Sequence, residues 1–298
     1  MLTWPKRIFF FVLTNILVIT LMSIVCWIFQ VPSHLTGTGL NLGALLVFSA
    51  IFGFIGSAVS LFLSKWMAKR GTGTVIIETP QNQTEQWLVD TVRGLSDKSG
   101  IGMPEVGIFP SEAPNAFATG WNRNNALVAV SAGLLQTMSK DEVEAVLAHE
   151  VAHVANGDMI TMALMQGVMN TFVIFLSRVI GYAVDKFVFK TERGVGWGYY
   201  ITVIVAQIAL GILASIVVNW FSRLREYRAD AGAARLRGPD AMISALEALR
   251  SPAPSEMPKS IAAFGIRGGG GGWAALFSTH PSIDDRIKAL ERFKQRQG

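Results

Sequence analysis

Long apolar runs alternate with amphipathic and polar stretches along this chain. Four runs stand out, at residues 8–29, 40–64, 159–184 and 197–221. Each is long enough to cross the hydrocarbon core of a bilayer as a helix, which takes about 20 residues. The hydropathy pattern therefore predicts a multi-pass α-helical membrane protein, and leaves open whether the third and fourth runs cross completely.

The stretch between the second and third runs has a different pattern. Residues 84–95 show the period of an amphipathic helix, and Ser139 with Glu142 forms a capping box that starts another helix. Three short strand-like runs lie between these helices, at 105–109, 115–121 and 126–133. Turn-forming residues separate the last two runs, which predicts a hairpin. We therefore expect an α+β domain outside the membrane.

These patterns divide the chain into four segments. The first is an N-terminal membrane region, residues 1–70, with its two spans. Residues 71–158 form the first part of the α+β domain, residues 159–221 the two further spans, and residues 222–298 the second part of the domain. The extramembrane domain is thus predicted to be built from two separate stretches of chain.

Composition and charge agree with membrane residence. Apolar residues make up 51% of the chain and charged residues 16%, against about 25% charged residues in a typical soluble protein. The net charge is +5, and the basic residues gather beside apolar runs, as at a membrane surface, rather than in a nucleic-acid-binding stripe. The chain also lacks a Walker pattern for nucleotide.

The helix that begins after Ser139 carries the clearest chemical signal. His149, Glu150 and His153 form a His-Glu-x-x-His motif. Residues four apart lie on one helical face, so both imidazoles can reach one metal ion, and imidazole nitrogen suits zinc. Glu150 is placed to take a proton from a zinc-activated water. The motif predicts a single catalytic zinc with Glu150 as the base.

A catalytic zinc needs a third protein ligand, and the residues alone leave this choice open. Glu226 is followed four residues later by Asp230 on the same helical face. This pair fits a carboxylate ligand and an acceptor that holds a ligand histidine by its other nitrogen. The two remaining histidines, His34 and His280, are alternatives.

Several motifs together resemble the HtpX-type membrane zinc metalloproteases, which are heat-shock-associated bacterial proteases related to the CAAX prenyl proteases. The motifs are "HEVAH" at 149–153, "NGDM" after it, "EYRAD" at 226–230 and "THP" near the C-terminus. The resemblance covers nearly the whole chain. It implies a cytoplasmic α+β domain in which the motif helix lies beside a small sheet, with His149, His153 and Glu226 as zinc ligands and Asp230 behind them.

The resemblance also assigns three further residues. Asn115 and Ala116 are expected on an edge strand that pairs with an extended substrate peptide. His280 is expected to donate to the oxyanion of the tetrahedral intermediate. The residue before a proline is pushed toward extended backbone, so His280 belongs to a loop that can present its imidazole.

The distribution of basic residues predicts which side of the membrane holds the domain. Lys6 and Arg7 precede the first span, and Lys65, Lys69 and Arg70 follow the second, whereas the loop at 30–39 has no Lys or Arg. By the positive-inside rule, both ends of this pair of spans are cytoplasmic. The basic loop at 185–196 departs from this pattern.

The motif helix stands directly before the third apolar run. Met159 is six positions after His153, which is about 9 Å if one helix runs on without a break. Such a site can attack polypeptides as they leave the bilayer. The resemblance implies an endopeptidase of the bacterial inner membrane that removes damaged or misassembled membrane proteins and unfolded polypeptides under stress. The alternatives are a processing peptidase for a defined peptide and a non-proteolytic membrane scaffold.

Overall fold

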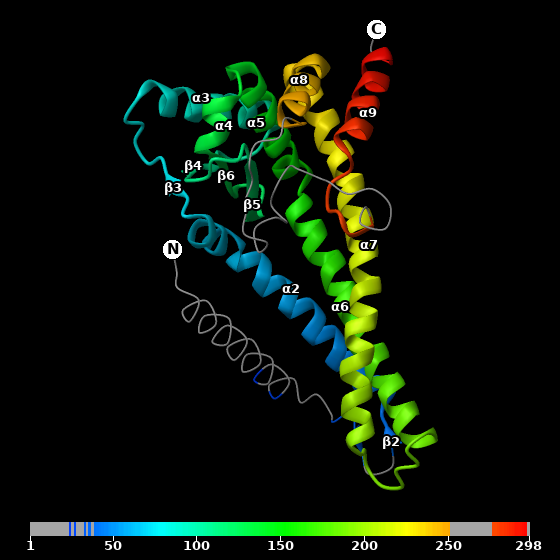
Figure 1. The fold of residues 1–298 in the computed structure, drawn as a ribbon. Coiled ribbons are helices and arrows are strands. Elements are labelled where there is room, and N and C mark those ends of the chain that lie inside the picture. Colours follow the sequence, from blue (N-terminus) through cyan, green and yellow to red (C-terminus); the bar gives the residue numbers. More distant parts are fainter. Residues whose placement is uncertain are drawn as a thin grey trace. The chain divides into compact units, whose positions relative to one another are not determined.

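The chain forms two compact units, which are described separately (Figure 1). Unit 1 comprises residues 1–60 and 163–215, and unit 2 comprises residues 61–162 and 216–298. The structure is a computed structural model that describes residues 39–250 and 276–296, with Ile24, Trp27, Ser33, Leu35 and Thr36. The predicted span at 8–29 lies outside the described residues, apart from Ile24 and Trp27.

Three helices in the described part of the chain have the length and composition of membrane spans. They are α2 (Leu42–Thr72), α6 (Asp158–Phe187) and α7 (Trp197–Arg237). These helices contain the second, third and fourth predicted apolar runs almost completely. Large apolar side chains on them are exposed, for example Phe172 at 63% and Ile208 at 62%. Such a surface is expected where lipid replaces water, which confirms the membrane-protein character of the chain.

Unit 1 consists of parts of these helices and a short pair of strands. Gly53 of α2 lies against α6, where an added Cβ would come within 2.7 Å of the carbonyl oxygen of Gly167. Small residues allow this close approach of two membrane helices. The buried Asp185 of α6 accepts hydrogen bonds from the backbone N–H groups of Gly196 (3.0 Å) and Tyr199 (3.1 Å) at the start of α7. The strands are β1 (Leu35–Thr36) and β2 (Gly39–Leu40).

Unit 2 contains a four-stranded sheet in the order β3-β4-β6-β5. The strands are β3 (Val75–Ile76), β4 (Glu105–Phe109), β5 (Ala116–Asn122) and β6 (Asn125–Ser131). The last two form the predicted hairpin, in which Ala116 pairs with Val130 and Asn122 with Asn125. Strand β4 runs parallel to β6. Strand β5 is the last in the order and has one neighbouring strand, so its outer side is an edge of the sheet as described.

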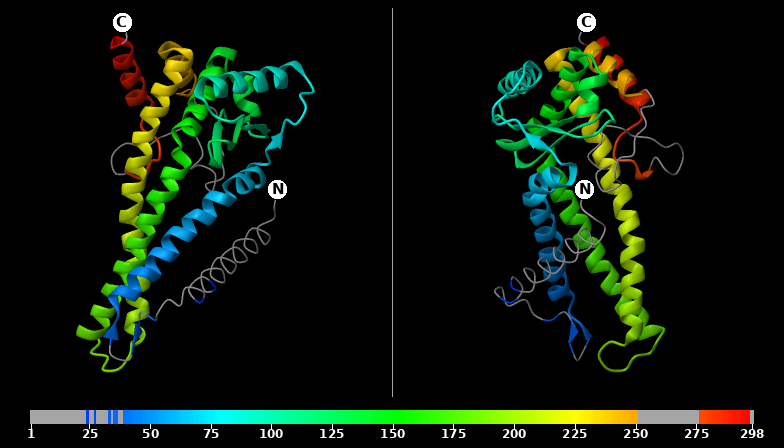
Figure 2. Two further views of the ribbon diagram at one scale, coloured as in Figure 1. Left: turned by 180° about the vertical axis from the view of Figure 1, so that it is seen from behind. Right: turned by 60° about the vertical axis from the view of Figure 1, so that its left-hand side comes forward.

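Five helices form the main core of unit 2 together with residues of this sheet. They are α3 (Gln83–Ser99), α4 (Ala132–Thr137), α5 (Lys140–Asn156), α8 (Pro239–Arg250) and α9 (Ile283–Gln295). The core that these helices share with the sheet includes Leu88, Val128, Val146, Leu246 and Leu290. Figure 2 shows α3 and α5 beside the strands. Alternate residues of β6 point to the other face, where a second cluster forms. The predicted α+β class is confirmed.

Two helix boundaries bear on the functional site. Helix α5 has the predicted capping box of Ser139 and Glu142, and its C-cap is Gly157, whose φ of 68° is left-handed. A new helix, α6, begins at Asp158. The motif helix therefore does not run unbroken into the third span. Helix α7, in contrast, continues from the fourth apolar run through Glu226 to Arg237 without interruption.

Candidate metal centre

Helix α5 places the two motif histidines side by side. His149 and His153 are one turn apart, and their Nε2 atoms lie 3.2 Å from each other. The rings meet edge to face, with their centroids 4.7 Å apart. His149 is buried at 1% exposure. The helix thus directs two imidazole lone pairs toward one point.

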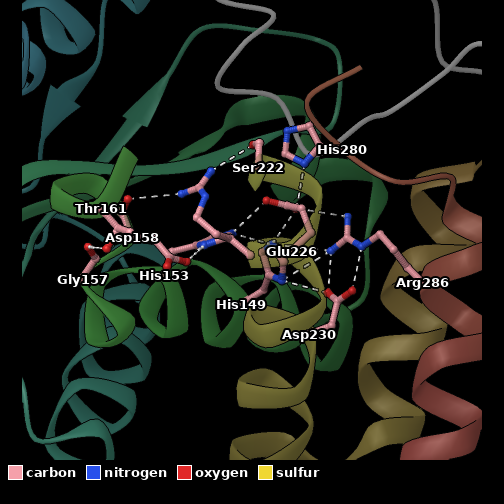
Figure 3. Close-up of polar contacts among 11 residues, drawn as sticks. His149, His153, Gly157, Asp158, Thr161, Ser222, Glu226, Asp230, His280 and Arg286 are labelled. Carbon is pink, nitrogen blue, oxygen red and sulfur yellow. Dashed lines mark hydrogen bonds and ion pairs between the residues drawn. The ribbon is translucent and has the colours of Figure 1, made fainter. Parts of the chain in front are cut away.

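Glu226 of α7 completes this group. Its Oε2 lies 3.5 Å from His149 Nε2, and its Oε1 lies 3.3 Å from His153 Nε2. Figure 3 shows the three side chains turned toward one another. The ligand atoms all lie within 4.8 Å of one another. Two imidazole nitrogens and one carboxylate are a donor set that fits catalytic zinc and leaves a position open.

Each histidine is held by a carboxylate at its other ring nitrogen. His149 Nδ1–H donates to Asp230 at 2.9 Å, and His153 Nδ1–H donates to Asp158 at 2.6 Å. Both carboxylates are nearly inaccessible, with 1% and 2% exposure. Such contacts fix the orientation and tautomer of a ligand histidine. The spacing from Glu226 predicts Asp230 in this position, whereas no spacing rule predicts the contact of Asp158 with His153.

Arg286 of α9 balances the negative charge on one side of the group. This fully buried side chain donates to both oxygens of Asp230, at 2.6 and 2.8 Å. Its Nη1 also lies 3.8 Å from Glu226 Oε2. A buried carboxylate is costly without such a partner. Arg286 therefore stabilises Asp230 and, through it, the position of His149.

The surroundings favour a positive charge on the histidines when no metal neutralises the carboxylates. Burial alone would lower the pKa of His153, but Glu226 and Asp158 outweigh it and raise the pKa to about 10. Burial likewise opposes a raised pKa at His149, and hydrogen bonds to Asp230 and Glu226 overcome it. A cation is thus electrostatically favoured here, and a metal that binds must displace protons.

Glu150, His280 and His34 occupy different surroundings. Glu150 is on α5 next to His149, at 5% exposure. His280 Nδ1–H donates to Glu226 Oε2 at 2.7 Å, and its Nε2 is buried without a hydrogen-bond partner among the described residues. His280 thus contacts the carboxylate of Glu226 and stands outside the potential ligand group. His34 lies outside the described residues.

Asn115 and Ala116 stand where β5 begins. Both are buried, at 2% and 0% exposure. The N–H of Asn115 donates to Ser131 Oγ at 2.9 Å, and its carbonyl oxygen accepts from the Ser131 N–H at 2.8 Å. Helix α5 packs against β5, so the edge strand and the motif helix are neighbours.

The fold and this site together are those of a membrane metallopeptidase, and comparison with known proteins specifies the kind. Residues 82–294 match the model of Peptidase family M48. The chain is 60% identical to the protease HtpX homolog of Thiobacillus denitrificans, over 96% of this chain and 98% of that protein. It is also 60% identical to protease HtpX of Thioalkalivibrio sulfidiphilus, over 97% and 100%. The chain therefore belongs to the HtpX proteases of peptidase family M48.

A solved structure supports the fold independently. The crystal structure of S. mikatae Ste24p matches with a TM-score of 0.67 at 16% identity, and the match covers 96% of this chain. The present chain spans 65% of the length of that protein. Family membership makes this protein a metalloendopeptidase of the membrane, associated with stress. It excludes the non-proteolytic scaffold considered from the sequence.

Proposed function

We propose that this protein is a zinc-dependent endopeptidase of the bacterial inner membrane that degrades damaged or misassembled membrane proteins and unfolded polypeptides. The observation that carries the proposal is the group of His149, His153 and Glu226, in which His149 and Glu226 are buried and His153 is half-buried. Two of these residues are on the helix that directly precedes the span α6, and the third is on α7, itself a candidate span. A peptidase centre tied to spans in this way suits substrates that emerge from the bilayer.

The three residues would hold a single zinc ion. Zinc bound there supplies the Lewis acidity that activates a water and polarises the peptide carbonyl. Glu150, next to His149, takes the proton of the attacking water and delivers it to the leaving amine. Asp230 keeps the His149 ring oriented, and Arg286 holds Asp230 in place. In this assignment the charged side chains of Glu226, Glu150, Asp230 and Arg286 each have a function.

Asn115 and Ala116 would bind the substrate. An extended peptide can add to the outer edge of β5, because backbone pairing at an edge strand binds a peptide without reading its side chains. Support comes from the place of β5 at the end of the described sheet and from its packing against α5. Backbone pairing suits a protease that accepts many unfolded segments.

Unit 2 would face the cytoplasm. The basic residues that follow the second span contact this unit, since Lys65 and Lys69 both pair with Glu105 of β4, the former at 2.9 Å. Lys65 also donates to the Asn125 side chain at 2.6 Å. The residues that the positive-inside rule assigns to the cytoplasm are thus bound to the sheet beside the proposed active centre.

Fragments of membrane proteins test both the substrate class and the side of the membrane. Cells with the active protein should accumulate cleavage products that cells with Glu150→Gln lack, because the substituted protein has no base. The cleavage sites should lie in cytoplasmic loops and termini of many membrane proteins. Mass spectrometry of isolated membranes measures this. Products from a single protein would instead indicate a processing peptidase, and sites in periplasmic loops would overturn the orientation.

His280→Ala should lower kcat and kcat/KM together, by about 100- to 1,000-fold, while zinc content and melting temperature hold. The reason is that His280 would donate to the oxyanion only as the tetrahedral intermediate forms. Its buried Nε2 has no hydrogen-bond partner among the described residues, and it can donate when both ring nitrogens carry a proton, with Nδ1–H still on Glu226. Steady-state kinetics on an unfolded protein substrate give the result, with Thr279→Ala as the neighbouring control. Loss of zinc would instead assign His280 to the support of Glu226.

A further inference from the structure

Asp158 both begins the candidate span α6 and contacts a histidine of the proposed metal centre. It is the first residue of the candidate span α6, yet its side chain is 2% exposed and accepts a hydrogen bond from His153 Nδ1 at 2.6 Å. His153 itself is on the preceding helix α5. The shortest polar contact of either motif histidine thus reaches across a helix boundary to the start of a membrane helix.

The backbone around Asp158 fixes this contact. Gly157 takes a left-handed φ of 68°, and its N–H donates to the Val154 carbonyl at 3.0 Å, so that α5 ends before α6 begins at Asp158. The Thr161 hydroxyl donates to the Gly157 carbonyl at 3.1 Å. Asp158 then stands at the N-terminus of α6, where the helix dipole favours a negative charge.

A second helix also holds this turn. Arg225 of α7 donates to the Asp158 carbonyl at 3.4 Å and to the Ser222 hydroxyl at 3.0 Å. Figure 3 shows Asp158 on the side of the metal-ligand group opposite to Asp230 and Arg286. The two histidines are therefore braced from opposite sides, one by a carboxylate of α7 and the other by a carboxylate of α6.

We propose that Asp158 is a positioning residue of the metal centre, which orients His153 so that its Nε2 faces the ion, and which thereby ties that ligand to the first turn of span α6. This proposal rests on the proposed zinc site. In this proposal Asp158 contacts neither the substrate nor the metal ion. A carboxylate behind a ligand histidine typically contributes about 10- to 100-fold to metal affinity.

The experiment measures zinc affinity of the full chain in detergent by competition with a chelator. Asp158→Ala should weaken zinc binding by about 10- to 100-fold, and should change the visible absorption spectrum of the cobalt-substituted protein, because the His153 ring is no longer fixed. Asp158→Asn should restore most of the affinity, since its amide oxygen can still accept from Nδ1–H.

Asp185→Ala is the matched control. Asp185 is also a buried carboxylate of α6, with 0% exposure, and it accepts two backbone hydrogen bonds far along the chain from the motif. Its removal should lower the melting temperature without changing zinc affinity or the cobalt spectrum. Should Asp158→Ala fail to fold, Asp158→Ser applies the same test, because serine keeps a small polar side chain at the helix start but is too short to hold the ring.

Unchanged zinc affinity and an unchanged cobalt spectrum in a folded Asp158→Ala or Asp158→Ser variant would overturn the positioning role. An equal loss of affinity in Asp185→Ala would do the same, because the effect would then be general destabilisation. Failure of the zinc site itself is distinguishable, since His149→Ala would then retain stoichiometric zinc. None of these readings depends on peptide cleavage.

Discussion

Glu150→Gln is expected to leave zinc in the protein and to abolish most peptide cleavage. Glutamine has nearly the same shape, and the three proposed ligands remain, so the metal stays bound. The amide cannot accept the proton of the attacking water, which removes a contribution of about 100- to 10,000-fold to the rate. Metal analysis and cleavage of a casein-type substrate on one sample measure both quantities.

Glu144→Gln on the same helix is the matched control for this substitution. The Glu144 carboxylate accepts from Trp87 Nε1 at 3.0 Å and pairs with Arg237, away from the metal-ligand group. Loss of its charge should affect stability more than turnover of the folded protein. Full activity of Glu150→Gln would contradict the assigned mechanism, because no base would then be needed at this position.

Glu226→Ala should remove both metal binding and activity. This residue contributes the carboxylate that faces both Nε2 atoms, at 3.3 and 3.5 Å. Without it the site keeps two imidazoles, too few for a catalytic zinc. Asp230→Asn should be milder, with about a 10- to 100-fold loss of zinc affinity, because it alters only the support of His149. Chelator competition ranks the two variants.

Glu247→Ala, an exposed carboxylate on α8, controls for the loss of a negative charge in unit 2. It should bind zinc like the unmodified protein. Stoichiometric zinc in Glu226→Ala would show that the third ligand is another residue. His280 is then the next candidate, because its Nδ1 lies 2.7 Å from the Glu226 carboxylate.

The local parts of this fold could be predicted from the sequence, because their signals are contained in a few neighbouring residues. The capping box of Ser139 and Glu142 correctly starts α5, and the turn after β5 correctly gives the hairpin. The break at Gly157 was also readable, since Asn-Gly after a histidine in the last turn is a helix stop signal. This signal argues against a helix that runs unbroken from His153 into the third apolar run.

The partners across the site could not be predicted in the same way. Arg286 pairs with Asp230 from a helix that begins more than fifty residues later, and no spacing rule links such positions. Asp158 follows His153 closely, but its role depends on the left-handed turn that swings it back toward the ring. Pairings set by tertiary packing leave no periodic trace in the sequence. The roles of the site residues themselves stay predictions until the substitutions above are made.

The order of unit 2 along the chain has a consequence for how the protein is made. The ribosome completes the first part of this unit, with His149 and His153, before it synthesises residues 163–215, and Glu226 emerges only afterwards. If Glu226 is the third ligand, a nascent chain that has not yet produced both apolar runs has no complete metal centre. In that case both apolar runs are synthesised before the metal centre can be completed. Any fragment that contains both histidines and Glu226 would then also contain both apolar runs.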